Sequence, residues 1–209
     1  MKQIEFFFDP ISPYAYLAFE HLPITLQGLS YQVQYRPVLF AGLLKHHGQL
    51  GPAEIAGKRE WTFRQVQWLA KAHGIELTLP QAHPFNPLGL LRLALACGAS
   101  GTCNRYVTET IFHHVWRKGG DPSDRAALAQ LSTTLAPQRS PDAEAVKAEL
   151  RANTDAAIAR SIFGVPTFAL DDKLFWGFDA LPMLREYLSG DAWYAGDAWA
   201  AAAALPVGE

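Results

Sequence analysis

The first forty residues show two hydrophobic patterns in turn. Residues 3–8 form a short, nearly continuous apolar run, which is typical of a strand buried on both faces. Apolar residues then recur at helical spacing from Pro13 to Pro23, and residues 31–38 alternate between polar and apolar as a strand does. Pro13 suits the first helical position, where a missing N–H costs no hydrogen bond. A strand, a helix and a strand in so few residues predict a right-handed βαβ unit.

The middle of the chain, after Pro37, predicts helices. Apolar positions recur at helical spacing, and glycine, proline and asparagine mark the ends of the segments. The clearest boundaries are Gly74, which ends one helix, and Asn86, which is placed to cap the next one. The last helix of this block is long, opens at Ser140, and is expected to break near Asn153.

Strand patterns return toward the C-terminal end. Residues 166–170 and 173–176 are predicted to form two short strands, with a tight turn at Asp171 and Asp172 between them. A closing helix is expected over roughly residues 179–188. The complete order is therefore β-α-β, a block of helices, and β-β-α.

This order predicts an α/β fold in which one compact layer is interrupted in sequence by a large all-helical insertion. We assign residues 1–38 and 156–190 to the α/β domain, 39–155 to the helical insertion, and 191–209 to a C-terminal tail. The tail repeats Asp-Ala-Trp, and its pattern leaves open whether its tryptophans dock on the domain.

The composition is that of a soluble globular protein, because 49% of its 209 residues are hydrophobic and 18% are charged. A formal net charge of −2 gives no basic surface for nucleic acid. No apolar run reaches the roughly 20 residues needed to span a bilayer, and the apolar run near the start is too short for a signal peptide. We therefore predict a cytoplasmic protein that binds neither nucleic acid nor a membrane.

Cysteine and histidine offer little chemistry of their own. Cys97 and Cys103 have neither a metal-binding nor a redox spacing, which favours two reduced thiols. The histidine pairs at 46–47 and 113–114 occupy neighbouring helical positions, about 100° apart, so we expect no metal site. The tryptophans expected in the core are Trp61, Trp68, Trp116 and Trp176.

The junction of the first strand and first helix, FFFDPISPYAYLA, carries the candidate chemistry. Many redox proteins place Cys-x-x-Cys at such a junction, whereas this chain has Ser12 and Ala15. On its residues alone, Ser12 is an N-cap that contributes about 1 kcal/mol. Alternatively, its hydroxyl donates to a ligand thiolate, because a helix N-terminus favours anions and lowers a thiol pKa from about 8.5. Serine cannot form a mixed disulfide, which excludes dithiol exchange at this position.

The element order, with GVPTF before the third strand, resembles the thioredoxin fold. More specifically, the chain resembles the 2-hydroxychromene-2-carboxylate isomerase family, a relative of kappa-class glutathione transferases. The resemblance covers nearly all of the first 188 residues and implies that Ser12 is catalytic and activates glutathione. The matching stretches are FDPISPYAYLA, RPVLFAGLLKHHG, AHPFNPLGLLR, LRANTDAAIARSIFGVPTFAL and LFWGFDALPMLREYL.

The same resemblance implies contacts with two parts of glutathione. The bond between Val165 and Pro166 is expected to be cis, and the backbone of Val165 to hold the cysteinyl part as an added strand would. Phe178 and Asp179 are expected to bind the γ-glutamyl end, although Asp179 could instead cap the last helix. Many family members have arginine after this aspartate. Here the residue is Ala180, so any role of that arginine is lost.

Further candidates for the site are polar or cationic. Lys58 falls where the family binds the glycyl carboxylate, and Gln49 aligns with an asparagine that contacts glutathione; Lys58 could equally be a solvated lysine near a helix start. Because the family's substrate carries a carboxylate, a second cation is expected nearby. Lys45, Arg36 and Arg92 are candidates, of which we favour Lys45 and Arg92 as substrate-binding residues. Each could instead be a surface or structural charge.

The implied activity is a glutathione-dependent isomerisation of 2-hydroxychromene-2-carboxylate to trans-o-hydroxybenzylidenepyruvate, a step in aromatic catabolism, with glutathione regenerated as a cofactor. The substrate is thus a small aromatic carboxylate. The main alternative is a kappa-type glutathione transferase or peroxidase that consumes glutathione. A carrier that binds conjugates without turnover is a third possibility, and the absent cysteine pair argues against a disulfide oxidoreductase. A homodimer is expected by analogy with relatives.

Overall fold

The computed structural model describes residues 1–204 and contains a four-stranded sheet in the order β2-β1-β3-β4. Its strands are β1 (Lys2–Phe8), β2 (Tyr31–Pro37), β3 (Thr167–Leu170) and β4 (Lys173–Trp176). β1 pairs in parallel with β2 and antiparallel with β3, which pairs antiparallel with β4. The thioredoxin-like order expected from the sequence, βαβ followed by ββα, is therefore confirmed.

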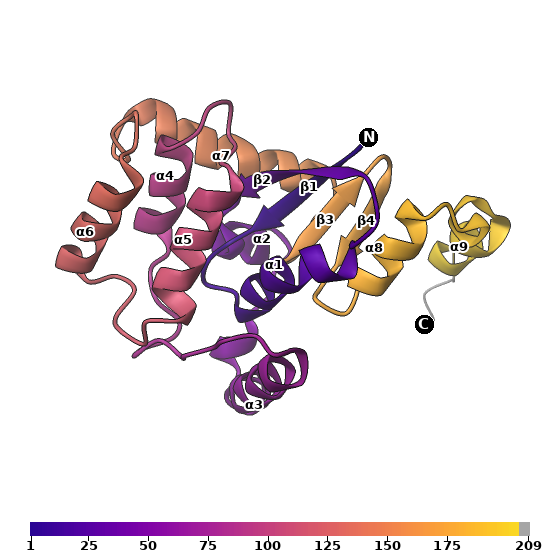
Figure 1. Ribbon diagram of the computed structural model, residues 1–209, viewed down its shortest axis with the longest axis horizontal. Helices are drawn as coiled ribbons and strands as arrows, with labels where there is room; N and C mark the ends of the chain where they lie inside the picture. The colour runs from indigo at the N-terminus through magenta and orange to yellow at the C-terminus, as the bar shows by residue number, and fades with distance from the viewer. Residues whose placement is uncertain (205–209) are drawn as a thin grey trace.

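The helices cover both faces of this sheet, and α6 lies beyond it on one side and α9 on the other (Figure 1). Short 3₁₀ turns lie at η1 (Pro52–Glu54) and η2 (Ala192–Ala195). The α-helices are α1 (Pro13–Thr25), α2 (Phe40–His46), α3 (Ala56–His73), α4 (Leu88–Ala96), α5 (Arg105–Trp116), α6 (Arg125–Leu135), α7 (Glu144–Ala159), α8 (Leu181–Leu188) and α9 (Asp197–Ala203).

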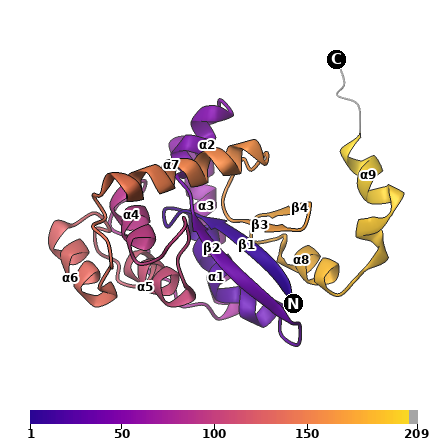
Figure 2. The ribbon, with the colours of Figure 1, turned by 90° about the horizontal axis from the view of Figure 1, so that it is seen from above.

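Alternating residues of β1 face two different cores, as strand geometry requires. Phe6 and Phe8 are fully buried in the larger cluster, which includes α1, α5 and α8. Phe7 faces the opposite side, where it packs in a smaller cluster with Leu43 of α2 and Ala157 of α7. The views agree that α2 and α7 cover one face and α1 the other (Figures 1 and 2). β1 is thus buried on both faces, as its apolar run predicted.

The helix ends differ from the sequence expectation at two places. α7 begins at Glu144 and continues through Asn153, so the expected opening at Ser140 and the break near Asn153 are wrong. The Asn153 side chain donates to the carbonyls of Pro37 (2.9 Å) and Gly101 (2.7 Å). It therefore joins distant segments without interrupting its own helix. The predicted boundary between residues 155 and 156 lies inside α7, and the division into two domains stays a prediction.

The start of α4 is shifted by one position from the expectation. Pro87 occupies the N-cap, and the Asn86 side chain instead accepts a hydrogen bond from the backbone N–H of Leu88 at 3.0 Å. Asn86 still satisfies a free donor at the helix start, so the physical reason for the prediction holds although the helix begins later.

The expectation that four tryptophans lie in the core is wrong for three of them. Trp116 is fully buried, but the exposed fractions of Trp61, Trp68 and Trp176 are 63%, 64% and 54%. Trp61 and Trp68 are seven residues apart, close to two helical turns, and so share the outer face of α3. Helical spacing thus marked a common face correctly, but that face points to solvent.

The first part of the tail is folded against the end of the sheet. Tyr194 in η2 is buried, and its ring lies 6.1 Å from that of Phe175 and 5.5 Å from that of Tyr187. Trp199 of α9 packs on the ring of Tyr194 at 5.3 Å. Figure 1 shows this segment beyond α8, at the far end from α6. The rest of the predicted tail, residues 205–209, lies outside the described residues.

Cys97 and Cys103 are free thiols, and burial raises the pKa of Cys103 to about 12. Among residues 1–204, none of the helices is both long and apolar enough to cross a membrane. The same part of the chain contains no group of three or more histidine, cysteine or acidic side chains arranged to hold a metal ion.

Candidate active site

Ser12 lies where the end of β1 meets the N-terminus of α1, and its hydroxyl makes two contacts. It accepts a hydrogen bond from the backbone N–H of Ala15 at 3.2 Å, so the predicted N-cap is confirmed. It also donates to the backbone carbonyl of Val165 at 3.3 Å, a contact that the sequence did not predict. The bond between Val165 and Pro166 is cis, as expected. The structure therefore brings Ser12 and Val165 together.

The surroundings of Ser12 favour a negative charge. The first turn of α1 contains no acidic residue, so the positive end of the helix dipole is not opposed there. Ser12 itself is 8% exposed, which places its hydroxyl at the edge of the protein interior. Hydrogen bonds to charged partners are stronger in such surroundings than in water.

Asp9, for which the sequence pattern predicted no role, connects the Ser12 loop to the start of α2. Its two carboxylate oxygens accept hydrogen bonds from the N–H groups of Ile11 (3.0 Å) and Phe40 (2.9 Å). Asp9 is fully buried, and this burial raises its pKa to about 7 although both hydrogen bonds act in the opposite direction. The sequence shows a single acidic residue after an apolar strand. It does not show the partners of that residue, because Phe40 is brought to Asp9 only by the folding of the chain.

Two more side chains fix the backbone of this loop. The Trp116 ring donates to the carbonyl of Pro10 at 2.9 Å, and the Nε2 atom of His83 lies 2.8 Å from the carbonyl of Ile11. Burial lowers the pKa of His83, which favours a neutral ring that donates from Nε2. Its Nδ1 atom is buried without a hydrogen-bond partner among residues 1–204. His83 stands in the stretch AHPFNP, whose pattern predicted no role for this residue.

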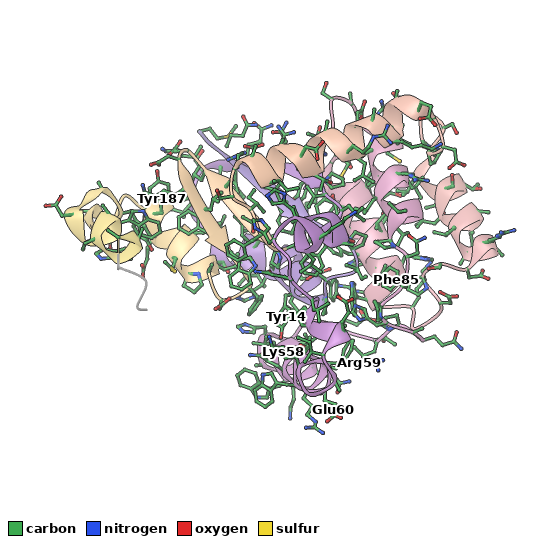
Figure 3. The ribbon with its side chains drawn as sticks, turned by 180° about the vertical axis from the view of Figure 1, so that it is seen from behind. Tyr14, Lys58, Arg59, Glu60, Phe85 and Tyr187 are labelled. Carbon is green, nitrogen blue, oxygen red and sulfur yellow. The ribbon has the colours of Figure 1, made fainter. Side chains whose placement is uncertain are left out.

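Helix α3 forms a wall beside the start of α1. The hydroxyl of Tyr14 donates to the side chain of Gln65 at 2.7 Å, and Thr62 lies beside it. Lys58 precedes Thr62 by four residues, so it shares this face of α3 one turn nearer the helix N-terminus. Figure 3 shows Tyr14 and Lys58 on this side of the molecule. Lys58 is exposed and free to meet a ligand carboxylate.

Asp179 lies near this wall and does not cap a helix. The N-cap of α8 is Ala180, and Asp179 is exposed. After burial, the charge of Asp179 is a further cause that raises the pKa of Tyr14, which places the carboxylate near that ring. A side chain on Gly177, whose φ is +98°, would collide with the Asp179 carboxylate. The turn thus fits glycine and leaves the carboxylate available.

Phe178 is placed differently from its neighbour. Its side chain is buried, with its ring 5.7 Å from that of His21 and 5.1 Å from that of His73. Gln49 is exposed after α2, where its backbone N–H donates to the carbonyl of Leu44 at 2.9 Å. Any contact of Phe178 with a ligand would therefore come from its backbone, and the roles of Phe178 and Gln49 remain predictions.

The three candidate cations are in different settings. Arg36 forms an ion pair with Glu5, which makes it structural. Lys45 is exposed in the last turn of α2. Arg92 lines a cavity of about 160 Å³ between α4 and α7, whose described lining includes neither Ser12 nor Val165. The structure therefore does not bring Arg92 and Ser12 into one cavity.

These contacts define what the site can do chemically. A hydroxyl at a helix N-terminus can donate to a thiolate, and a neighbouring backbone carbonyl can accept from a peptide N–H. A cation on α3 and a carboxylate beside Tyr14 provide charges for the two ends of a zwitterionic peptide. The site thus suits a thiol-containing peptide, whereas the chain's own thiols lie outside these contacts.

Comparison with known proteins agrees with this geometry. Residues 3–189 match the family model described as DSBA-like thioredoxin domain. A 2-hydroxychromene-2-carboxylate isomerase of Sphingobium xenophagum is 28% identical over 194 residues, covering 90% of this chain and 98% of that protein. Glutathione S-transferase kappa 1 of Rattus norvegicus is 25% identical over 210 residues, with 92% of each chain covered. A solved structure of a 2-hydroxychromene-2-carboxylate isomerase superposes with a TM-score of 0.79 at 27% identity, covering 94% of this chain and 98% of that one.

Proposed function

Because this chain belongs to the family of DSBA-like thioredoxin domains and has serine in place of a redox cysteine at the start of α1, we propose that it is a glutathione-dependent isomerase. Its substrate would be 2-hydroxychromene-2-carboxylate or a similar aromatic carboxylate. The observation that carries the proposal is the contact of the Ser12 hydroxyl with the carbonyl of Val165, at 3.3 Å. This contact joins a donor suited to a thiolate with a backbone suited to a peptide.

The named relatives support the substrate class. The isomerase of Sphingobium xenophagum and the solved isomerase structure align with this chain along almost their whole lengths. Asp179 would bind the ammonium group of glutathione and Lys58 its glycyl carboxylate, while Lys45 would meet the carboxylate of the substrate. Each assignment uses an exposed charge: Asp179 lies just before α8, Lys58 on α3 and Lys45 on α2.

The proposed reaction is an isomerisation, so substrate and product have the same atoms and glutathione is not consumed. Glutathione loses its thiol proton, and Ser12 donates a hydrogen bond to the resulting thiolate. The thiolate adds to the conjugated carbon of the ring-opened substrate, and the double-bond electrons move onto the carbonyl oxygen as an enolate. The carbon–carbon bond is then single and can rotate. Collapse of the enolate expels the thiolate and leaves the other geometric isomer, so glutathione returns unchanged.

The proposal includes a setting in aromatic catabolism in the cytoplasm, where reduced glutathione is abundant. It also includes a homodimer, which rests on analogy with relatives. Light scattering of the purified protein at several concentrations checks the homodimer, since a mass of one chain throughout would contradict it.

The decisive experiment follows the ultraviolet spectrum of 2-hydroxychromene-2-carboxylate with the protein, in the presence and absence of glutathione. Total thiol is counted at the end. We expect isomerisation that requires glutathione and leaves total thiol unchanged. Replacing Ser12 by alanine should lower the rate about 10- to 100-fold, which corresponds to loss of one hydrogen bond to a charged group.

Asn104→Ala is the matched control, because Asn104 caps α5 as Ser12 caps α1 and accepts from Val107 at 2.9 Å. This variant should lose comparable stability and keep its activity. Loss of thiol into a conjugate would instead indicate a transferase, the activity named for the kappa relative. Binding of glutathione with no turnover in either the protein or its Ser12→Ala variant would indicate a carrier.

A further inference from the structure

The Ser12 hydroxyl has one proton, and in the structure this proton is already used. The hydroxyl oxygen accepts a hydrogen bond from the N–H of Ala15, and its proton is donated to the carbonyl of Val165, 3.3 Å away. Both Ser12 and Val165 are more than nine-tenths buried. A serine hydroxyl can donate only once, so it cannot serve this carbonyl and a thiolate at the same time.

Turning the hydroxyl toward a thiolate therefore has a cost at Val165. A buried carbonyl that loses its donor is destabilised by an amount comparable with the gain from a new hydrogen bond. The cost disappears if the incoming ligand brings its own donor to the same carbonyl. The oxygen of Ser12 does not need to move in this exchange, because the N–H of Ala15 holds it in either state. Only the hydroxyl hydrogen changes position, by rotation about the Cβ–Oγ bond.

We infer that the ligand's amide N–H and the Ser12 hydroxyl exchange partners at Val165. Resting on the proposed function, this inference defines the class of thiol that the site activates. The ligand must carry an N–H on the residue that bears its thiol, as an N-acylated cysteine does. That N–H takes over the carbonyl of Val165, the Ser12 hydroxyl turns to the sulfur, and the thiol proton leaves to the solvent. A simple thiol without such an N–H stays protonated in the site.

The test compares glutathione with its depsipeptide analogue, in which an ester oxygen replaces the N–H between the γ-glutamyl and cysteinyl parts. The analogue has the same thiol, charges and size, but no donor for Val165. The pKa of each bound thiol is measured from the ultraviolet absorbance of the thiolate, with the wild-type protein and with Ser12→Ala. Ser12→Thr, which keeps a hydroxyl and the capping oxygen, serves as the conservative variant.

With glutathione, Ser12→Ala should raise the pKa of the bound thiol by about one unit, and Ser12→Thr should restore most of the shift. With the analogue, the same Ser12→Ala change should shift the pKa by a small fraction of that amount, because the hydroxyl stays with Val165. The analogue should bind about tenfold more weakly than glutathione, corresponding to one neutral hydrogen bond. If the exchange occurs, the effect of removing the Ser12 hydroxyl therefore depends on whether the ligand has its amide N–H.

Equal effects of Ser12→Ala with both ligands would overturn the exchange and leave the proposed function intact. A loss of analogue affinity of more than about a hundredfold would also overturn the exchange. If Ser12 keeps its hydrogen bond to the Val165 carbonyl when the analogue binds, that carbonyl always has a donor, and only one neutral hydrogen bond is lost. If Ser12→Ala changed neither the pKa of bound glutathione nor the isomerisation rate, the proposed function itself would fail, and the inference with it.

Discussion

Two neighbouring polar residues, Ser12 and Asp9, are buried under opposite electrostatic conditions. Ser12 is neutral and lies at a helix N-terminus, which favours a negative partner. Asp9 is itself an acid whose ionised form two N–H donors favour, but its complete burial outweighs them and raises its pKa to about 7. The motif around Ser12 made that residue predictable from the sequence. Asp9 and His83 were not predictable, because their roles depend on partners from distant segments.

The raised pKa of Asp9 predicts a pH dependence of stability. Between the ordinary value of 3.8 and about 7, the folded protein holds a proton on Asp9 that the unfolded chain has lost. The free energy of unfolding therefore falls as pH rises through this window, by at most about 1.4 kcal/mol per pH unit, and levels off above it. Asp9→Asn should remove this slope. Asparagine also loses one of the two hydrogen bonds, which adds a constant cost.

Urea unfolding of both proteins at several pH values between about 4.5 and 8 measures the difference. The wild-type protein should lose stability relative to Asp9→Asn up to about pH 7, and the difference should then become constant. Parallel stability curves across the whole range would show that Asp9 has an ordinary pKa in the folded state.

At the scale of elements, the loop that carries Ser12 is held by residues between β2 and β3. Helix α5 supplies Trp116, which binds the carbonyl of Pro10, and the segment before α4 supplies His83, which binds that of Ile11. The sequence predicted both helices because their apolar periodicity is local. It failed at Asn153 of α7, where a polar residue suggested a break, because the contacts of that side chain lie far away in the sequence.

Trp116→Phe should weaken the attachment of the Ser12 loop to α5. The change keeps an aromatic ring but removes the donor to Pro10, leaving a buried carbonyl and a small void. We expect the free energy of unfolding to fall by about 2–3 kcal/mol and the affinity for glutathione to fall with it. Urea unfolding and calorimetric titration measure the two effects. Trp68→Phe, at a site 64% exposed, should change stability by less than about 0.5 kcal/mol. Equal effects of the two substitutions would contradict the role given to Trp116.

For the molecule as a whole, the C-terminal segment contributes to stability at a place remote from Ser12. Tyr194 is 2% exposed, packs on Phe175 and Tyr187, and donates to Glu186 at 3.1 Å. The sequence showed an alanine- and tryptophan-rich tail but could not show where it docks. Docking depends on a surface composed of β4 and α8, which exists only in the folded domain.

Tyr194→Ala should lower the free energy of unfolding by roughly 3 kcal/mol, the usual cost of deleting a buried aromatic ring. The affinity for glutathione should stay unchanged, since the contacts described for this ring are with β4, α8 and the tail itself, not with the loop that carries Ser12. Thermal unfolding and titration calorimetry separate these effects. Trp193→Ala provides the control in the same turn, because that ring is 43% exposed and should matter much less. Weakened glutathione binding in Tyr194→Ala would mean that the tail reaches the site.

Ser12 and Val165 meet across 153 positions of the chain, and the β1–β3 pairing spans a similar distance. A ribosome adds about 5–20 residues per second, so roughly 8 to 30 seconds separate the synthesis of the two residues. During that interval β1 has β2 as a neighbour but lacks β3, the partner on its other edge. The helices between them can form early from local contacts. The contact between Ser12 and Val165 can therefore form only after residue 165 has left the ribosome, so the proposed site is among the last features of the fold to be completed.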